Sequence, residues 1–277
     1  MAYGTVVADV VQSSVTGVSL GAGNATLLKN RLIDAGFIIN QRGYVSGTSL
    51  SAGTYAHDRW KAGASGCTYT FTQGSLGVPI VITITAGSLQ QVIEGCNMPD
   101  GGTFTLSWTG TAQGRVNGGG YSTSPLIVTG LTAGANCTVE FNTGTLSFPQ
   151  LEVGTSATGF EYRQYQQELA LCQRYTKLCG AGFIGNATAG ASYVQASTSF
   201  GQPMRASPSV ALISGANVNF VCGETVETAS SPSLSTTYLN PNGVCVRISG
   251  FTSSLAWVDQ RPAQSTSDNW LLATAEL

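Results

Sequence analysis

Residues 103–109 read Thr-Phe-Thr-Leu-Ser-Trp-Thr, an alternation of small polar and large apolar side chains. Successive side chains of a β-strand point to opposite faces, so this pattern predicts a strand with one face in a core. The same period of two recurs in the runs Cys67-Tyr69-Phe71, Val78-Ile80-Ile82-Ile84 and Cys137-Val139-Phe141. Several short alternating runs predict an all-β fold.

Turn-forming stretches separate these runs at Pro99–Gly102, Asn117–Gly120 and Ala133–Asn136. Gly, Asn, Asp and Pro supply the backbone conformations that tight turns require. We therefore expect residues 31–163 to form one domain, a β-sandwich or a jelly roll. No repeat of fixed period is present, which argues against a triple-stranded β-helix shaft.

One segment, Gln164–Leu178, has the spacing of a helix, and Gly180 follows it as a stop signal. Its apolar stripe would consist of Leu169, Cys172 and Tyr175, while Glu168 and Arg174 would remain in water. We expect a short connecting helix over residues 164–179, packed on the jelly roll or on partner helices.

Residues 180–277 return to strand patterns and predict a second, C-terminal β-sandwich domain. The expected strands are Tyr193–Phe200, Ser209–Ile213, Val218–Cys222, Val244–Ile248, Leu255–Val258 and Trp270–Ala275. Ser230–Ser235 and Asn240–Gly243 are expected as loops. Residues 1–30 are too few to fold alone and predict a separate N-terminal segment that needs a partner.

The chain carries few charges. Charged residues make up 9% of it, hydrophobic residues 42%, and the formal net charge is −2. This balance gives no electrostatic attraction to nucleic acid or to an anionic membrane. A protein with so few charges tends to self-associate, which favours an oligomer that buries part of its surface. The apolar stretch near Val78–Ile84 is interrupted by Pro and Thr, and the N-terminus has no signal-peptide pattern, so neither membrane insertion nor export is expected.

Seven cysteines are present without a Cys-x-x-Cys pair, and the chain has one histidine. A zinc site is therefore not expected. Cys67 and Cys137 fall on apolar strand faces, which predicts buried free thiols in a protein that folds in a reducing cytoplasm.

Catalytic patterns are weak. His57 adjoins Asp58, and neighbours in a strand point to opposite faces, so the two are poorly placed to form a relay and a surface or hinge histidine is the simpler interpretation. The acids show no recognisable facing pair of the kind that glycosidases use. None of Glu94, Asp100, Glu140 and Glu152 is in such a pairing. The sequence predicts no enzyme, no cofactor and no metal.

Aromatic residues in loops are better candidates for binding. Tyr121 follows a triple glycine and has Arg115 and Asn117 nearby, and Tyr44 follows Arg42-Gly43. An exposed aromatic ring with a few polar groups is the usual form of a sugar site on a β-sandwich. Trp257 and Trp270 are similar candidates in the C-terminal domain, whereas Trp60 and Trp108 are expected in the core, each bracketed by buried neighbours.

Two separate motifs carry a family resemblance. The first comprises Leu28–Ile33, Phe37–Arg42, Tyr55 and Asp58-Arg59-Trp60; the second comprises Gln150-Leu151-Glu152, Gly154, Ala157-Thr158, Phe160-Glu161, Arg163, Glu168-Leu169 and Cys172–Tyr175. In this order they resemble the opening and the close of a domain in tailed-bacteriophage structural proteins, which include tail fibres, spikes and head fibres. The matched region, 28–175, covers more than half of the chain. The chain departs from the family at Asp34-Ala35-Gly36, where Asn-Gly is common, which weakens any inference about that turn.

The resemblance implies a virion protein assembled in the host bacterial cytoplasm, with a carbohydrate-binding-module-like jelly roll. It further implies a homotrimer, an N-terminal segment that anchors to other virion proteins, and a C-terminal domain that serves as trimerisation region or tip. A tail fibre or receptor-binding protein that attaches to a host-surface glycan is the expected function. A head fibre or capsid decoration protein stays open. A capsule depolymerase is disfavoured because the sequence lacks the pattern of a long β-helix with acidic clusters. A free carbohydrate-binding module is disfavoured because the sequence shows no secretion signal and no linker to a catalytic partner.

Overall fold

The computed structural model describes residues 29–180, 182–187, 193–213, 218–222, 225–251, 261–265 and 269–277. The predicted N-terminal anchoring segment therefore lies almost entirely outside the described residues, as do the expected strand Leu255–Val258 and Trp257. Strands account for 49% of the structure and helix for 6%, which confirms the all-β prediction. The chain divides into two compact units, Met1–Leu169 with Leu277 and Ala170–Glu276, and each is described by itself.

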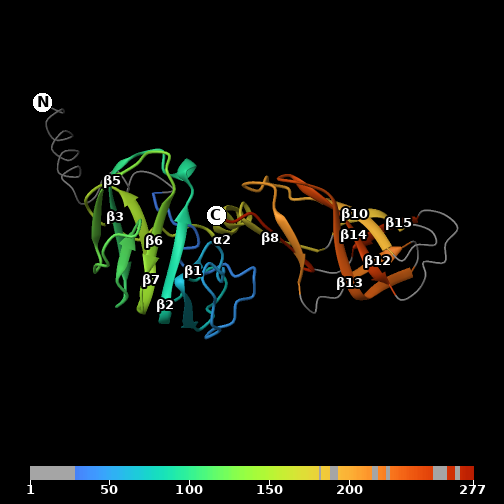
Figure 1. Ribbon diagram of the computed structural model, residues 1–277, viewed down its shortest axis with the longest axis horizontal. Coiled ribbons are helices and arrows are strands. Elements are labelled where there is room, and N and C mark those ends of the chain that lie inside the picture. The colour runs from blue at the N-terminus through green and yellow to red at the C-terminus, as the bar shows by residue number, and fades with distance from the viewer. Residues whose placement is uncertain are drawn as a thin grey trace, which may run out of the picture. The chain divides into compact units, whose positions relative to one another are not determined.

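The first unit contains a seven-stranded antiparallel sheet. Its strands are β1 (Lys61–Phe71), β2 (Ile82–Ile93), β3 (Gly102–Thr109), β4 (Gly114–Val116), β5 (Leu126–Leu131), β6 (Cys137–Phe141) and β7 (Gly144–Val153), with a 3-10 turn η1 (Gly95–Asn97) after β2. The strand order is β4-β6-β2-β7-β3-β5, and β1 pairs with β2 outside this path. Figure 1 shows β3, β7, β6 and β2 running along one another.

The alternation seen in the sequence builds the core of this unit. Phe104, Leu106 and Trp108 of β3 are buried together, and Trp60 is completely buried, as predicted for both tryptophans. Each indole N–H is satisfied, since Trp108 Nε1 donates to the Ala112 carbonyl at 2.8 Å and Trp60 Nε1 to the Asp34 carbonyl at 2.9 Å. The polar alternate positions are also covered in places: Thr105, Gln150 and Glu152 are buried.

The predicted helix is shorter than expected. The helix α2 spans Tyr165–Gln173, and the residues Thr176–Cys179 form strand β8 instead. This strand pairs with β16 (Leu271–Thr274), so backbone pairing with a distant segment overrides the local helical spacing. Glu168, expected in water, is buried and accepts a hydrogen bond from the Asp34 backbone N–H.

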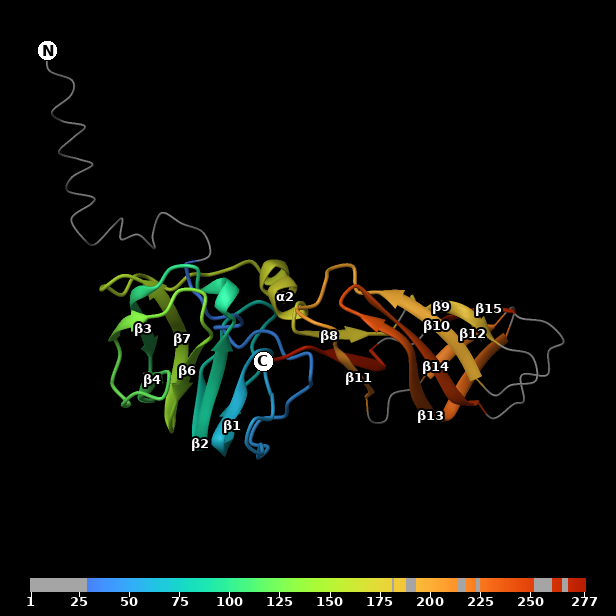
Figure 2. The same cartoon turned by 45° about the horizontal axis from the view of Figure 1, so that its top comes forward.

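The second unit, expected as a β-sandwich, contains a closed ring of strands in the order β10-β14-β13-β12-β15-β9 and a three-stranded sheet β11-β16-β8. The remaining strands are β9 (Ile184–Ala187), β10 (Tyr193–Ser199), β11 (Ser209–Leu212), β12 (Val218–Cys222), β13 (Thr225–Asn240), β14 (Gly243–Phe251) and β15 (Arg261–Ser265). Figure 2 shows the long strand β14 between β10 and β13, with both of which it pairs. Ser230–Ser235, expected as a loop, lies within β13.

Its core includes Phe183, Phe220 and Trp270, all completely buried. Trp270 packs on Phe183 with ring centroids 4.7 Å apart and donates its indole N–H to the Gly180 carbonyl at 3.1 Å. Burial of this kind stabilises a domain by roughly 1.5–3 kcal/mol for each large apolar side chain.

Candidate functional site

The outer face of β4, β6 and β2 carries a connected group of polar side chains, which we call the Arg115 cluster: Ser88, Arg115, Tyr121 and Glu140. The register places Arg115 opposite Glu140, and Glu140 opposite Gln90. Gly114 and Val116 face the core, so the period of two directs Arg115 outward.

Glu140 is the centre of this cluster. The residue is 8% exposed, and its carboxylate accepts a hydrogen bond from Ser88 Oγ at 2.5 Å. Arg115 donates to the other carboxylate oxygen through Nε at 2.8 Å, and its second nitrogen lies 2.7 Å from the same oxygen. These charge-assisted hydrogen bonds fix the guanidinium, and the hydrogen bond to Glu140 raises the pKa of Arg115.

Tyr121 completes the arrangement. The Arg115 guanidinium carbon lies 4.4 Å from the centre of the Tyr121 ring, a cation–π geometry. Partial burial and the nearby Glu140 charge raise the pKa of Tyr121, so the phenol stays protonated and can donate a hydrogen bond. The pair predicted from sequence, Arg115 and Tyr121, is therefore brought together.

A glycine makes room for the cluster. A Cβ at Gly63 of β1 would lie 2.0 Å from Ser88 Oγ and 2.9 Å from Glu140 Oε1. Any larger residue there would displace the serine hydroxyl that orients Glu140. Ser88, Glu140 and Gly63 were not predicted as site residues, because only the strand register reveals that they meet.

Asn117, the third candidate in this region, is exposed and forms part of the turn after β4. Its backbone is left-handed, with φ 48°, and its side-chain oxygen accepts a hydrogen bond from the Thr138 N–H at 2.8 Å. Asn117 thus shapes the turn that precedes Tyr121.

The expected exposure of Tyr44 is wrong. The side chain is 9% exposed, and its ring centroid lies 4.7 Å from that of Tyr69. The hydroxyl donates to the Thr48 carbonyl at 2.7 Å, and burial raises the pKa of the phenol. Tyr44 is buried because its loop folds over the aromatic side chains of β1, and a ligand on the surface would not reach its ring.

His57, expected at a surface or hinge, is completely buried. Nδ1 lies 2.6 Å from the Tyr69 hydroxyl, and the rings of Phe71 and Phe37 pack around the imidazole at 4.7 and 5.9 Å. Burial lowers the pKa of His57 to about 4, so the ring is neutral at pH 7. Asp58 accepts a hydrogen bond from the Gln41 backbone N–H at 3.0 Å.

Of the two tryptophan candidates of the C-terminal region, the structure describes Trp270 alone. Trp270 is completely buried in the core of the second unit, so its expected exposure is wrong. Trp257 lies outside the described residues.

A pocket in the second unit was missed by sequence reasoning. It has a volume of about 500 Å³ and is bordered by Tyr238, Ile184 and Ser197. Tyr238 is 64% exposed, and its hydroxyl accepts a hydrogen bond from Asn240 Nδ2 at 2.8 Å. The only sequence signal is the Asn240–Gly243 turn that follows this tyrosine.

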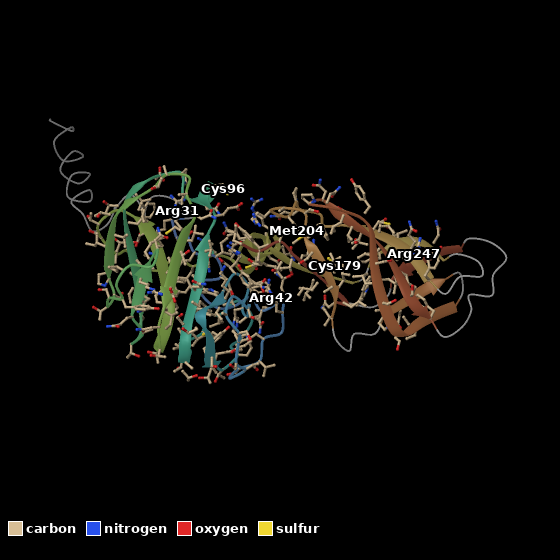
Figure 3. The ribbon with its side chains drawn as sticks, in the orientation of Figure 1. Arg31, Arg42, Cys96, Cys179, Met204 and Arg247 are labelled. Atoms are coloured by element: carbon tan, nitrogen blue, oxygen red, sulfur yellow. The ribbon has the colours of Figure 1, made fainter. Side chains whose placement is uncertain are left out.

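Six cysteines form no disulfide: Cys67, Cys96, Cys137, Cys172, Cys179 and Cys245. Cys67 and Cys137 are buried as predicted, and burial raises the pKa of their thiols to about 12 and about 11. Cys96 is exposed at η1, whereas Cys179 is buried in the second unit (Figure 3).

Within the described ranges, no group of three or more His, Cys, Asp or Glu side chains is placed to hold a metal ion. In the same part of the chain, no helix is both long and apolar enough to cross a membrane.

Comparisons with known proteins give no relative for this chain: no family model, no curated protein and no solved structure matches it.

Proposed function

We propose that this chain is a structural protein of a tailed-bacteriophage virion, a homotrimeric tail fibre or receptor-binding protein that attaches to a host-surface glycan. The first unit would be the jelly-roll, carbohydrate-binding-module-like domain that the two motifs at residues 28–60 and 150–175 suggest. The observation that carries the binding part is the Arg115 cluster on an outer sheet face.

The chemistry of this cluster suits a saccharide. A sugar ring presents C–H groups on its faces and hydroxyls at its edge, so it stacks on an aromatic ring while nearby polar groups bind its hydroxyls. Tyr121 offers the ring, and Arg115 offers donors that Glu140 holds in place. An open site of this kind leaves little free energy after the cost of association, so a single site would bind weakly, with a Kd on the order of millimolar to micromolar.

Trimerisation would compensate for this weakness through avidity. Exposed aliphatic side chains support self-association: Leu76 is 79% exposed, Val78 52% and Val81 55%, all within six residues of one another. Clustered exposed apolar residues are typical of protein interaction surfaces. Sedimentation in dilute buffer should give three chains per particle, and a monodisperse monomer at micromolar concentration would contradict the trimer.

Binding of the fluorescently labelled protein to host cells tests the glycan assignment. Tyr121→Ala and Arg115→Ala should each reduce binding at least tenfold, and periodate oxidation of cell-surface sugars should abolish it. Tyr238→Ala serves as the control, because it removes an exposed tyrosine from the other unit. Loss of binding in Tyr238→Ala alone would move the site to the second unit. Cryo-electron microscopy of the intact particle would reveal whether the protein sits on the tail or the capsid.

A further inference from the structure

A second aromatic surface of the first unit lies on β3, β7 and the segment after β7. Phe148, Phe160 and Tyr162 form a trio with ring centroids 5.1 Å apart for the pairs Phe148–Phe160 and Phe160–Tyr162, and 6.1 Å apart for Phe148–Tyr162. Tyr162 is 69% exposed, and the two phenylalanines are half-buried. The trio borders a pocket of about 280 Å³.

The backbone is distorted where it presents this trio. Phe148 has φ 54°, a left-handed conformation that a non-glycine residue rarely adopts. The pairing of β3 with β7 shifts register between Ser107 and Thr109, so that the Phe148 region of β7 carries an extra residue. Such bulges redirect side chains, and they concentrate near functional sites. The bulge explains how an aromatic side chain of β7 reaches the surface beside Tyr162.

The polar wall of the pocket presents hydroxyl groups but little charge. Ser107 and Thr109 line it, and Thr158 lines it with a hydroxyl that is already hydrogen-bonded to Glu152 and Lys29. The carboxylate of Glu152, behind this wall, is buried and accepts hydrogen bonds from the Thr158 N–H at 2.8 Å and the Thr158 hydroxyl at 2.6 Å. Lys29 donates to Thr158 Oγ1 at 2.5 Å. The charged groups of Glu152 and Lys29 are thus hydrogen-bonded within the protein, so an ionic ligand would gain little binding energy in this pocket.

We infer that this aromatic pocket is a second saccharide-binding site, which takes a neutral sugar unit stacked on Tyr162 or Phe148 with its hydroxyls toward the hydroxyl-bearing wall. Three features favour this ligand class: exposed ring faces, hydroxyl partners and a volume near the lower limit for small-ligand pockets, roughly 300 Å³. The inference rests on the proposed function, because it specifies a further place where a glycan would bind. The site lies on β3 and β7, whereas the Arg115 cluster lies on β4, β6 and β2.

Saturation-transfer NMR with neutral oligosaccharides tests this assignment on the full chain. The probes are maltose, cellobiose, lactose and N,N′-diacetylchitobiose at millimolar concentration. Two variants remove the aromatic surface. Tyr162→Ala deletes the exposed ring, and Phe148→Gly deletes a ring while it relieves the left-handed backbone, so folding should persist. Far-UV circular dichroism and melting confirm that each variant is folded.

The expected result is transfer from at least one probe to the wild type, a loss of at least tenfold in apparent affinity for Tyr162→Ala and Phe148→Gly, and normal binding by the control Tyr238→Ala, which removes an exposed tyrosine outside both sites. Binding that is unchanged in both aromatic-pocket variants but lost in Tyr121→Ala would overturn this inference and leave the proposed function intact. No transfer from any probe, together with periodate-sensitive binding to host cells, would also overturn it and again leave the proposed function standing. A change of the sedimenting species from trimer to monomer in Tyr162→Ala would instead identify the surface as a contact between copies of the chain, which likewise overturns the inference.

Discussion

The sole histidine offers a sharp test of the core of the first unit. His57 is completely buried, and its Nδ1 lies 2.6 Å from the Tyr69 hydroxyl. The Tyr69 hydroxyl also accepts the His57 backbone N–H at 3.3 Å, so its own proton is available for Nδ1. The imidazole is thereby neutral, and within the described chain no side chain or backbone group pairs with Nε2. Protonation would place a charge among aromatic rings.

The magnitude follows from the pKa. The folded-state pKa of His57 is about 4, compared with 6.5 for an unperturbed histidine. Because the folded pKa is lowered, the folded state binds fewer protons than the unfolded state between these values. The free energy of unfolding therefore has its full contribution from neutral His57 above pH 6.5, and this contribution decreases as pH falls toward 4. Each unit of pKa difference corresponds to about 1.4 kcal/mol, so the loss between pH 7.5 and pH 5 should be about 2 kcal/mol.

NMR of selectively ¹³C-labelled histidine measures this pKa directly, because the chain contains one histidine. The ring resonance should titrate with a midpoint near 4, or remain unchanged until the protein unfolds. Urea unfolding of the wild type and of His57→Asn then isolates the energetic effect. Asparagine keeps an acceptor near Tyr69 but does not titrate. The difference in free energy of unfolding between wild type and His57→Asn should therefore change by about 2 kcal/mol over the same pH range. A midpoint near 6.5 would refute the burial argument.

Three further outcomes are expected. Asp34 is buried, and desolvation and then the neighbouring acids raise its pKa above 3.8. The ionised carboxylate therefore destabilises the folded state, and this destabilisation grows as pH rises through the folded-state pKa. Asp34→Asn should raise the melting temperature at pH 8 and have less effect at pH 5. Gly63→Ala should displace Ser88 and cost about 1–3 kcal/mol in chemical denaturation, whereas the open position Gly120→Ala should be nearly neutral. Since six of the cysteines form no disulfide, a reductant should leave the melting temperature nearly unchanged; a fall of many degrees would show a disulfide.

The sequence predicted the faces of strands well. Phe104, Leu106 and Trp108 lie in the core because a period of two fixes their side of the sheet regardless of the rest of the fold. The helix prediction failed at its C-terminal end, since the strand pairing of Thr176–Cys179 with Leu271–Thr274 involves residues nearly a hundred positions apart. Local spacing contains no information on such a partner.

Strands without alternating apolar residues were also missed. β13 extends through Ser230–Ser235, a Ser/Pro-rich stretch typical of loops. Pro232 lies where the pairing with β14 shifts register between Ala229 and Ser233, and an irregularity of this kind accommodates a proline that cannot donate to the ladder. The long partner strand β14, with Val244, Val246 and Ile248 buried, holds the polar segment in place.

Exposure was the hardest property to predict, because it depends on what covers a residue and not on the residue itself. Tyr44 and Tyr121 both follow glycines in expected loops, yet Tyr44 is buried under its own loop and Tyr121 lies beside Arg115 on an outer face. The exposure of Phe148 likewise could not be predicted from its neighbours in the sequence. In an unbroken alternation a phenylalanine would be assigned to one face by its neighbours, but the bulge in β7, opposite Ser107–Thr109 of β3, moves Phe148 toward Tyr162. The backbone distortion therefore determines which aromatic rings are available to a ligand, and composition alone could not reveal it.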